Sequence, residues 1–347
     1  MALRVGIAGA GVLGRLLAVQ LSRAGHSVQV FDPADGPGPH DASGARAAGW
    51  TAAGMLSPVA ELERVGAEVF ALGLRSCALW PQIVQGLVQP VDLRMQGSLL
   101  LAHRSDAGAA QRVVGLLQAK ADAAYQPEPL PLSQLRELEP SISGPALAWL
   151  LPSEGQIHPV QALQALAAQA TAQGVEWHWG ASVSAVTAGQ LLVDGQCHHF
   201  DHVFDARGVG AKPAVPVRGV RGEVFWLHAP GVPLQRPVRL LHPRHSIYMV
   251  PRPGDVIVVG ASEIESEDRS PVSLRSTIEL LSAAHSAMPA LAEARVVHTE
   301  TNLRPALPDN LPALRYAPGL TVINGLFRHG WLIAPALVEQ ALQELSP

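Results

Sequence analysis

The sequence has few cysteines, few charged residues and no apolar run of the roughly eighteen residues that a membrane span needs. Only 16% of its 347 residues are charged, and only two are cysteine, Cys77 and Cys197. Two cysteines cannot form a disulfide framework or a zinc site, so we expect a protein of the reducing cytoplasm. The net charge of −4, without a block of lysine or arginine, predicts neither a nucleic-acid partner nor a membrane partner.

The sequence also shows no residue pattern of a metal site or of a secretory signal. The 14 histidines are scattered without the spacing of metal ligands, so we predict no metal site. The apolar N-terminus does not read as a secretory signal, because three glycines interrupt it and a single arginine precedes it. Hydrophobic residues make up 48% of the chain, and a chain of this length can bury a substantial core.

The opening residues carry the most specific pattern. A short apolar strand precedes three glycines in GxGxxG spacing, Gly9, Gly11 and Gly14, and an apolar helix follows them. In this motif Gly9 makes the tight turn, Gly11 lets backbone amides approach a diphosphate, and Gly14 allows close helix–strand packing. The next strand, Ser27–Phe31, ends in Asp32, at the distance where an acid accepts hydrogen bonds from a ribose diol. We predict dinucleotide binding; the alternative is a glycine turn that serves packing alone.

The rest of the pattern predicts two interleaved domains. Parallel βαβ pieces occur at both ends of the chain, and runs typical of antiparallel strands lie between them. We predict an α/β fold in which a Rossmann-like domain with a parallel sheet (1–85, 150–215 and 300–347) is interleaved with an antiparallel-sheet domain (86–149 and 216–299). The expected helices are 109–124, 133–138, 159–173, 274–288 and a last helix to about 345. The expected strands include 94–103, 175–179, 182–186, 203–206, 221–228, 246–251, 256–261 and 320–324.

Several motifs in combination resemble those of one enzyme family. They are the glycine turn with Ala18 after it, Ala52-Ala-Gly-Met-Leu56, Gly155-Gln-Ile-His-Pro159, Tyr248-Met-Val-Pro-Arg252, Asn302-Leu-Arg-Pro305 and Phe327-Arg-His-Gly330. With these motifs the sequence resembles the D-amino-acid-oxidase-like flavoenzymes over nearly its whole length, and among them the glycine oxidases of thiamine biosynthesis. The resemblance implies FAD as the cofactor and makes the Rossmann-like domain the FAD-binding domain.

The resemblance also implies which residues contact the cofactor. The opening turn and the acid bind the ADP half, the backbone of Val183 meets the adenine, and the segment around Gly54 lies along the isoalloxazine. The loop before the last helix faces the pyrimidine edge of the flavin. Independently, a helix start offers free N–H groups to negative charge at that edge, although an ordinary strand–turn–helix connection is the alternative. The implied cofactor-binding residues are Gly9, Gly11, Val12, Leu13, Gly14, Asp32, Pro33, Ala53, Gly54, Met55, Val183, Gly208, Phe327, His329, Gly330, Trp331 and Leu332.

The sequence departs from the family pattern at some of these places. Ala-Gly-Trp stands at 48–50, where relatives have serine or threonine, so this segment offers fewer hydroxyl contacts to the phosphate or ribose. Arg207 stands where a small residue is common, and Gly210 replaces a tryptophan of many relatives. Ser246 stands where a relative has an active-site histidine, so no histidine role is carried over.

Two arginines and a tyrosine are candidates for the substrate end. A carboxylate is best bound by the planar fork of an arginine, and the best candidates are Arg304 and Arg328. By resemblance, Arg304 pairs with the substrate carboxylate, Arg328 borders the same pocket beside the flavin, and Tyr248 shares the carboxylate. Met55 shapes the reacting face and completes the predicted catalytic set. The alternatives are a structural ion pair for each arginine and a core position for the tyrosine.

The implied reaction is oxidative deamination of a small amino acid, glycine first, to an imine and then a 2-oxo acid. Hydride passes from Cα to flavin N5, and dioxygen reoxidises the flavin with formation of hydrogen peroxide. The cofactor and its orientation carry this step, so no dedicated base is required. A retained imine would serve thiamine thiazole synthesis. The alternatives are sarcosine, D-amino acids or another secondary amine as substrate, a quinone or carrier protein as acceptor, and a catalytically silent nucleotide-binding protein; a homo-oligomer also stays open.

Overall fold

The opening strand, turn and helix form as predicted. A computed structural model describes residues 2–39, 46–242 and 247–345. Strand β1 (Arg4–Ala8) is buried after its first residue, Gly9 turns the chain with a φ of +102°, and helix α1 (Val12–Arg23) packs its apolar residues inward. Strand β2 (Ser27–Asp32) then pairs in parallel with β1, which completes the predicted strand–helix–strand unit.

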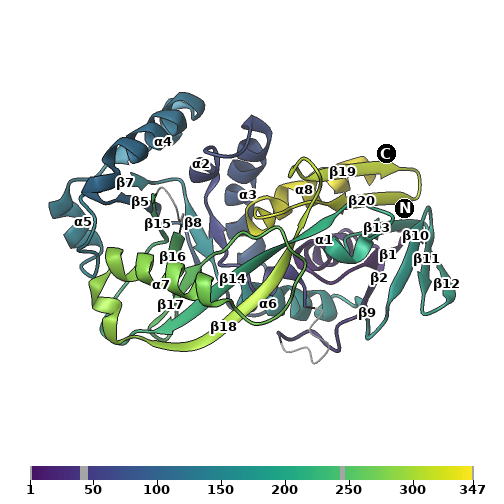
Figure 1. Cartoon of the computed structure of the whole chain (residues 1–347). Coiled ribbons are helices and arrows are strands. Elements are labelled where there is room, and N and C mark those ends of the chain that lie inside the picture. The colour runs from purple at the N-terminus through teal and green to yellow at the C-terminus, as the bar shows by residue number, and fades with distance from the viewer. Residues whose placement is uncertain (1, 40–45, 243–246, 346–347) are drawn as a thin grey trace.

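A six-stranded sheet is built around this unit, in the order β19-β20-β13-β1-β2-β9 (Figure 1). Five strands are parallel, and only β19 runs antiparallel to its neighbour. In a parallel sheet the carboxyl ends of the strands share one edge, where nucleotides bind. Distant segments of the chain therefore meet beside the glycine turn. The added strands are β9 (Glu176–Trp179), β13 (His202–Asp205), β19 (Ala313–Ala317) and β20 (Leu320–Asn324).

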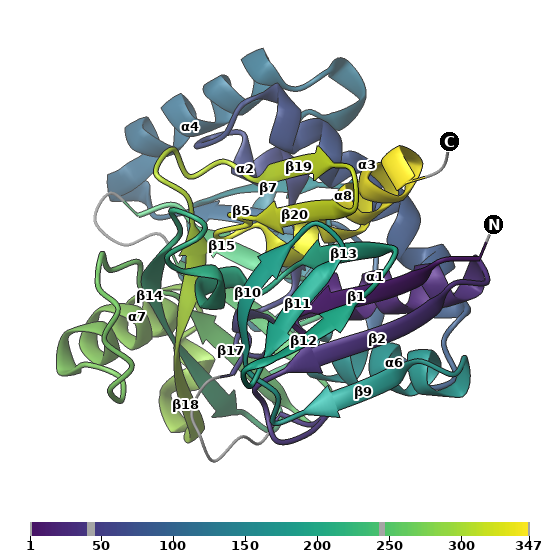
Figure 2. The same cartoon turned by 90° about the vertical axis from the view of Figure 1, so that its right-hand side faces the viewer.

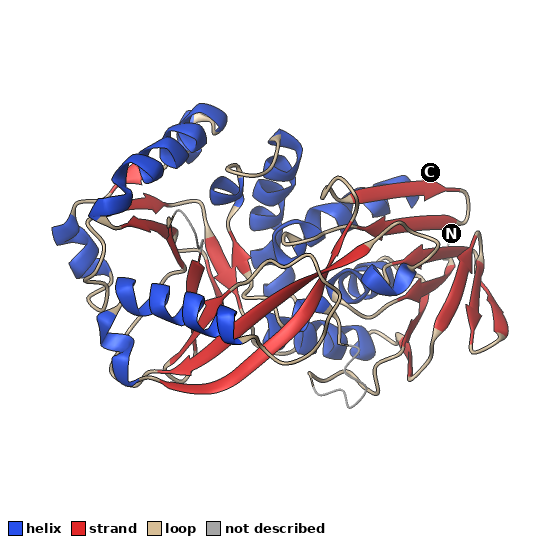
Figure 3. Ribbon diagram, viewed as in Figure 1, coloured by secondary structure: helices blue, strands red, loops and turns tan. Residues whose placement is uncertain are grey.

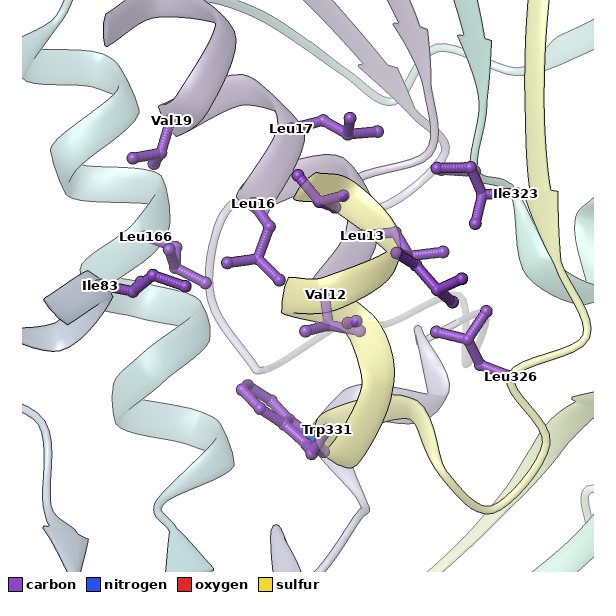
Figure 4. Close-up of a cluster of buried hydrophobic side chains, with 14 of the residues drawn as sticks. Val12, Leu13, Leu16, Leu17, Val19, Ile83, Leu166, Ile323, Leu326 and Trp331 are labelled. Atoms are coloured by element: carbon purple, nitrogen blue, oxygen red, sulfur yellow. The ribbon is translucent and has the colours of Figure 1, made fainter. Parts of the chain in front are cut away.

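Helices cover one face of this sheet. Helix α1 packs against α6 (Pro159–Ala172) and α8 (Gly330–Leu345), and α3 (Ala67–Gln85) packs against α8. Figure 4 shows Leu16 of α1 close to Leu166 of α6 inside the resulting core. Complete burial of such a side chain contributes roughly 1.5–3 kcal/mol. The opposite face of the sheet packs against a small antiparallel sheet of β10 (Val183–Thr187), β11 (Gln190–Val193) and β12 (Gln196–His199).

A second, eight-stranded sheet stands beside the first, in the order β18-β14-β17-β16-β15-β5-β7-β6 (Figures 1 and 3). Every neighbouring pair is antiparallel except β15 with β5. Its two longest strands, β14 and β18, pair with each other. The strands are β5 (Ser98–Ala102), β6 (Glu128–Pro129), β7 (Leu147–Leu151), β14 (Arg218–His228), β15 (Val238–Leu240), β16 (Ile247–Arg252), β17 (Val256–Gly260) and β18 (Arg295–Ala306).

Short elements connect the two sheets and cover the second one. Helix α7 (Leu274–Ala287) packs its apolar residues against β15, β16 and β17. Figure 2 shows α4 and α7 at opposite sides of the second sheet. A three-stranded sheet brings together β3 (Met55–Leu56), β8 (Gly155–Ile157) and β4 (Leu93–Arg94). The remaining helices are α2 (Pro58–Glu61), α4 (Ala107–Lys120) and α5 (Leu132–Leu138).

The α/β class and the interleaved sheets are confirmed, with local differences. The expected strand 94–103 is two strands, because Gly97 turns the chain between them with a φ of +82°. The helix expected at 109–124 ends at Lys120. The patterns above include no element for 58–85, where α2 and α3 form, and neither β11 nor β12 of the three-stranded β10–β12 sheet. The domain boundaries stay a prediction. Within the described ranges, no helix has both the length and the apolar character that a membrane crossing requires.

Candidate active site

One large cavity, of about 1230 Å³, joins the glycine turn to the substrate residues predicted from the sequence. Ordinary small-molecule pockets measure roughly 300–1,000 Å³, so this cavity suits a ligand larger than a single amino acid. All of the predicted cofactor and catalytic residues line it except Gly14. That glycine lies behind the turn, where an added Cβ would stand 1.8 Å from the carbonyl oxygen of Gly9. Its predicted packing role is therefore confirmed by geometry.

The turn is held open by backbone and carboxylate contacts. The N–H of Gly9 donates to the carbonyl of Phe31 at 2.8 Å. Asp32 accepts hydrogen bonds from the N–H groups of Ala10, at 2.6 Å, and Ala34, at 2.9 Å. Gly11 precedes α1 in extended conformation and carries no capping side chain. The first N–H groups of α1 are therefore free to bind an anion.

The loop between β20 and α8 closes the other side of the cavity. Gly325 and Phe327 adopt positive φ values of +76° and +45°, and the N–H of Phe327 donates to the carbonyl of Pro305 at 2.8 Å. Helix α8 then begins at Gly330, with the indole of Trp331 donating to the carbonyl of Gly49 at 3.1 Å. The positive end of the dipole of this long helix therefore lies at the cavity, where the sequence predicts the pyrimidine edge of a flavin.

Arg304 lines the cavity and has no acidic ion-pair partner among the described residues. Its Nη1 donates to the carbonyls of Ser262, at 3.0 Å, and Arg221, at 3.3 Å. An added Cβ on Gly222 would stand 2.5 Å from Nη2, so the glycine makes room for the guanidinium. Desolvation inside the protein lowers the pKa of Arg304 below its usual value, although the group stays charged at neutral pH. A buried cation of this kind favours an anionic ligand.

Tyr248 lies beside this guanidinium. Its strand pairs Tyr248 with Gly260, where an added Cβ would stand 2.5 Å from the phenol oxygen. Burial raises the pKa of the Tyr248 phenol, against the smaller opposite effect of Arg304. The hydroxyl is therefore protonated at neutral pH and able to donate. The side chain faces the same cavity as Met55, which is partly buried.

Arg328 differs from Arg304, because two carboxylates hold it. Its Nε lies 3.2 Å from Glu61, and its Nη1 lies 3.2 Å from Glu263. The ion pair that the sequence left as an alternative is thus present for Arg328. Burial opposes ionisation of Glu61, but the charges of Arg328 and Arg239 outweigh it and hold the pKa of Glu61 well below its usual range. His329 lies 3.4 Å from the same carboxylate, and burial lowers its pKa to about 4, so the imidazole is neutral at pH 7.

Glu61 is a cavity residue that sequence reasoning missed. It stands in the apolar run Pro58-Val-Ala-Glu61-Leu62, and a lone acid in such a run is the signal that could have found it. Arg239 donates to it from the second sheet at 2.6 Å. Glu154, nearby, accepts hydrogen bonds from Ala60 at 2.7 Å and Ser98 at 2.5 Å. This cluster joins α2 to the second sheet behind the substrate end.

Trp50 and Arg207, two residues at which the sequence departs from the family pattern, make defined contacts in the structure. Trp50 is buried and lies against the guanidinium of Arg15, 5.0 Å from the ring centroid. Arg207 makes an ion pair with Asp205 at 2.7 Å, and its Nη1 donates to the carbonyl of Val183 at 2.8 Å. The backbone predicted to meet adenine therefore already accepts one hydrogen bond from the protein. Ser246 lies outside the described residues.

The residues present fit FAD. Gly54, with a φ of +63°, brings the backbone so close to β8 that an added Cβ would stand 2.1 Å from the carbonyl of Ile157. Ala53, Gly54 and Met55 line the same cavity as the glycine turn and the tyrosine. A nucleotide turn at one end of the cavity and an arginine with a tyrosine at the other are what an oxidoreductase with a dinucleotide cofactor requires.

Comparison with known proteins identifies the family. Residues 4–341 match the family described as FAD dependent oxidoreductase (DAO). A Rhizobium etli protein named as a thiamine biosynthesis oxidoreductase, ThiO, is 36% identical over 99% of this chain and 96% of its own length. The glycine oxidase of Geobacillus kaustophilus is 27% identical over 95% of this chain and 89% of its own length. Its crystal structure superimposes with a TM-score of 0.84 at 26% identity, covering 99% of this chain and 94% of that one.

The chain therefore belongs to the DAO family of FAD-dependent oxidoreductases, and it is an amine oxidase of the glycine oxidase type with FAD as its cofactor. The similarity extends over almost the whole length of both proteins, so it covers the eight-stranded sheet as well as the six-stranded one. The family resemblance deduced from the sequence motifs is confirmed. The contacts of individual residues with FAD and substrate stay predictions.

Proposed function

We propose that this enzyme oxidises glycine, or a closely similar small amino acid, with dioxygen as the electron acceptor. In the overall reaction glycine, dioxygen and water become glyoxylate, ammonia and hydrogen peroxide. The glycine oxidase neighbour supports the substrate, and the relative named for thiamine biosynthesis supports a role of the imine in thiazole assembly. The two free cysteines, Cys77 and Cys197, support the cytoplasm as the compartment.

The observation that carries this proposal is the guanidinium of Arg304. It lines the cavity, makes hydrogen bonds to two backbone carbonyls and has no carboxylate partner in the described part of the chain. A substrate carboxylate would complete its coordination, with the Tyr248 hydroxyl as a second donor. Arg328 is occupied by Glu61 and Glu263, so we assign it a bordering role rather than carboxylate binding.

The chain's own groups bind and orient the substrate rather than exchange protons with it. FAD, when bound, accepts the two electrons and the hydrogen that leave the substrate carbon. His329 is neutral and Tyr248 is protonated at pH 7, so Arg304 presents the positive charge that fixes the carboxylate end. With the carboxylate fixed, the small substrate would lie in the cavity that Ala53, Gly54 and Met55 also line. Positioning of this kind supplies much of the rate enhancement in reactions that need no base.

The visible spectrum under anaerobic conditions tests the substrate. The yellow holoenzyme is mixed with glycine, sarcosine or D-alanine in separate experiments, and the loss of flavin absorbance is followed. We expect glycine to bleach the flavin, and to do so much more slowly in Arg304→Ala at equal concentration. Bleaching by sarcosine or D-alanine but not by glycine would reassign the substrate, and readmitted air tests the acceptor through hydrogen peroxide formation.

A further inference from the structure

The segment 46–51 lies directly against the glycine turn. An added Cβ on Gly11 would stand 3.6 Å from the Cβ of Ala47, and one on Gly49 would stand 3.8 Å from the Cβ of Val12. Arg46, Ala47 and the turn line the same cavity. The side chains of this segment are therefore the nearest neighbours of any diphosphate that the free N–H groups of α1 bind.

Most of this segment has no side chain to offer to a phosphate. Residues 47–49 are Ala-Ala-Gly, and Trp50 is buried against Arg15. The hydroxyl of Thr51 accepts a hydrogen bond from Asn302 at 3.0 Å and keeps an uncharged O–H as its only donor. A diphosphate carries two negative charges, and the dipole of α1 balances only about half a charge. Arg46 is thus the residue of this segment that can supply opposite charge.

The other cations near the glycine turn make contacts of their own, and the Nη1 of Arg269 donates to the side-chain oxygen of Asn302 at 3.1 Å. Arg15 donates to the carbonyls of Ala10 and Leu163 at 2.7 and 2.8 Å. Arg207 is held by Asp205 and Val183, as described above. Lys212 pairs with Glu267. None of these groups can turn toward the glycine turn without breaking contacts of its own.

The guanidinium of Arg46 is paired through Nη1 but not through Nε. Its Nη1 lies 3.1 Å from Glu300, which also pairs with His298 at 3.1 Å. Its Nε is buried and has no partner among the described residues. Asn302 donates to the carbonyl of Ala47 at 3.3 Å, which fixes the following backbone to β18. A buried N–H group without a partner is unfavourable unless a ligand accepts from it.

We propose that Arg46 binds the diphosphate of FAD, and that its charge-assisted hydrogen bonds replace the hydroxyl contacts that 47–50 lack. Glu300 orients the guanidinium through Nη1, while Nε and Nη2 face the phosphate oxygens. The proposal depends on FAD being the cofactor and not on which amine is oxidised. It is therefore tested by binding, without turnover.

The test measures dissociation constants of FAD and of ADP for the apoprotein by fluorescence quenching and calorimetry. ADP carries the diphosphate without the flavin. We expect Arg46→Ala to weaken both ligands about 10- to 100-fold, the range for loss of a charge-assisted hydrogen bond. Arg46→Lys keeps the charge without the fork, so its loss should fall between wild type and Arg46→Ala. The thermal midpoint of each apoprotein shows whether the fold is retained.

Two further variants separate a phosphate contact from a structural ion pair. Glu300→Gln removes the opposing charge but keeps an amide oxygen that accepts from Nη1 and orients the guanidinium, so we expect ADP affinity to stay equal or to rise. Arg64→Ala removes another cavity arginine, 3.6 Å from Glu263 at the substrate side, and should leave ADP affinity unchanged. An ADP affinity of Arg46→Ala within twofold of wild type would overturn the proposal. Equal weakening by Arg46→Ala and Glu300→Gln would overturn it as well.

Discussion

Replacement of Arg304 by alanine should separate substrate binding from cofactor binding. Loss of one partner of a buried, charge-assisted pair costs about 2–5 kcal/mol, or roughly 30- to several-thousand-fold in affinity. The structure places the expected effect in the lower half of this range. Tyr248 remains as a donor to the carboxylate, and the carbonyls of Ser262 and Arg221 lose their donor in the free enzyme too. We therefore expect the KM for glycine to rise about a hundredfold.

Steady-state kinetics over a wide glycine range, together with FAD titration of the apoprotein, measure this effect. FAD affinity should change less than threefold, because Arg304 enters from β18 at the substrate end. Arg236→Ala is the control for loss of a partly buried arginine, since Arg236 pairs with Glu139 at 3.1 Å and does not line the cavity. A KM of Arg304→Ala within threefold of wild type, with Arg236→Ala unchanged, would refute carboxylate binding by Arg304.

Three other predictions follow from the cavity walls. In Gly222→Ala the new methyl group would stand 2.5 Å from Nη2 of Arg304, so the KM for glycine should rise at least tenfold with little loss of stability. The control Gly115→Ala, whose methyl group would have no atom within 4 Å, should leave KM unchanged. Gly11→Val should fold, because its first side-chain atom meets only Ala47 at 3.6 Å, but it should purify colourless, because the side chain would occupy the place of the diphosphate. Gly14→Ala should instead lower the melting temperature. Yellow Gly11→Val protein would contradict the placement of the diphosphate. Burial lowers the pKa of His329 from 6.5 to about 4. Between these pH values the imidazole is protonated in the unfolded chain but neutral in the folded one. The free energy of unfolding should therefore fall by up to about 3 kcal/mol as pH falls from 6.5 to 4. Urea denaturation of wild type and His329→Gln across this range should show a smaller fall in the variant, and equal slopes would contradict it.

The sequence predicted the nucleotide side well because its constraints are local. The glycine spacing, the apolar strands and the acid at Asp32 all lie within a few dozen residues, and together they favour a strand–turn–helix unit. The same holds for α6, which begins at Pro159 and ends before Gly174 with its φ of +84°. The predicted site residues other than Gly14 also line one cavity, although the motifs that contain them are separated by up to about 300 residues.

The partners of these residues could not be predicted, because they depend on tertiary contacts. Arg328 has no acid among its four neighbours on either side, yet Glu61 and Glu263 reach it from two other elements. Arg207 reads as a departure from a pattern, and only the fold shows that Asp205 and Val183 hold it. A sequence reports which side chains are available, whereas the pairing of charges is decided where distant segments meet.

A crystal structure of the enzyme with FAD and acetate, a carboxylate without an amine, tests the central claim most directly. The account predicts the diphosphate at the N–H groups that follow Gly11, and the acetate oxygens within hydrogen-bond distance of Arg304 and Tyr248, over the flavin ring. Acetate bound elsewhere, or a flavin ring far from the guanidinium of Arg304, would contradict it.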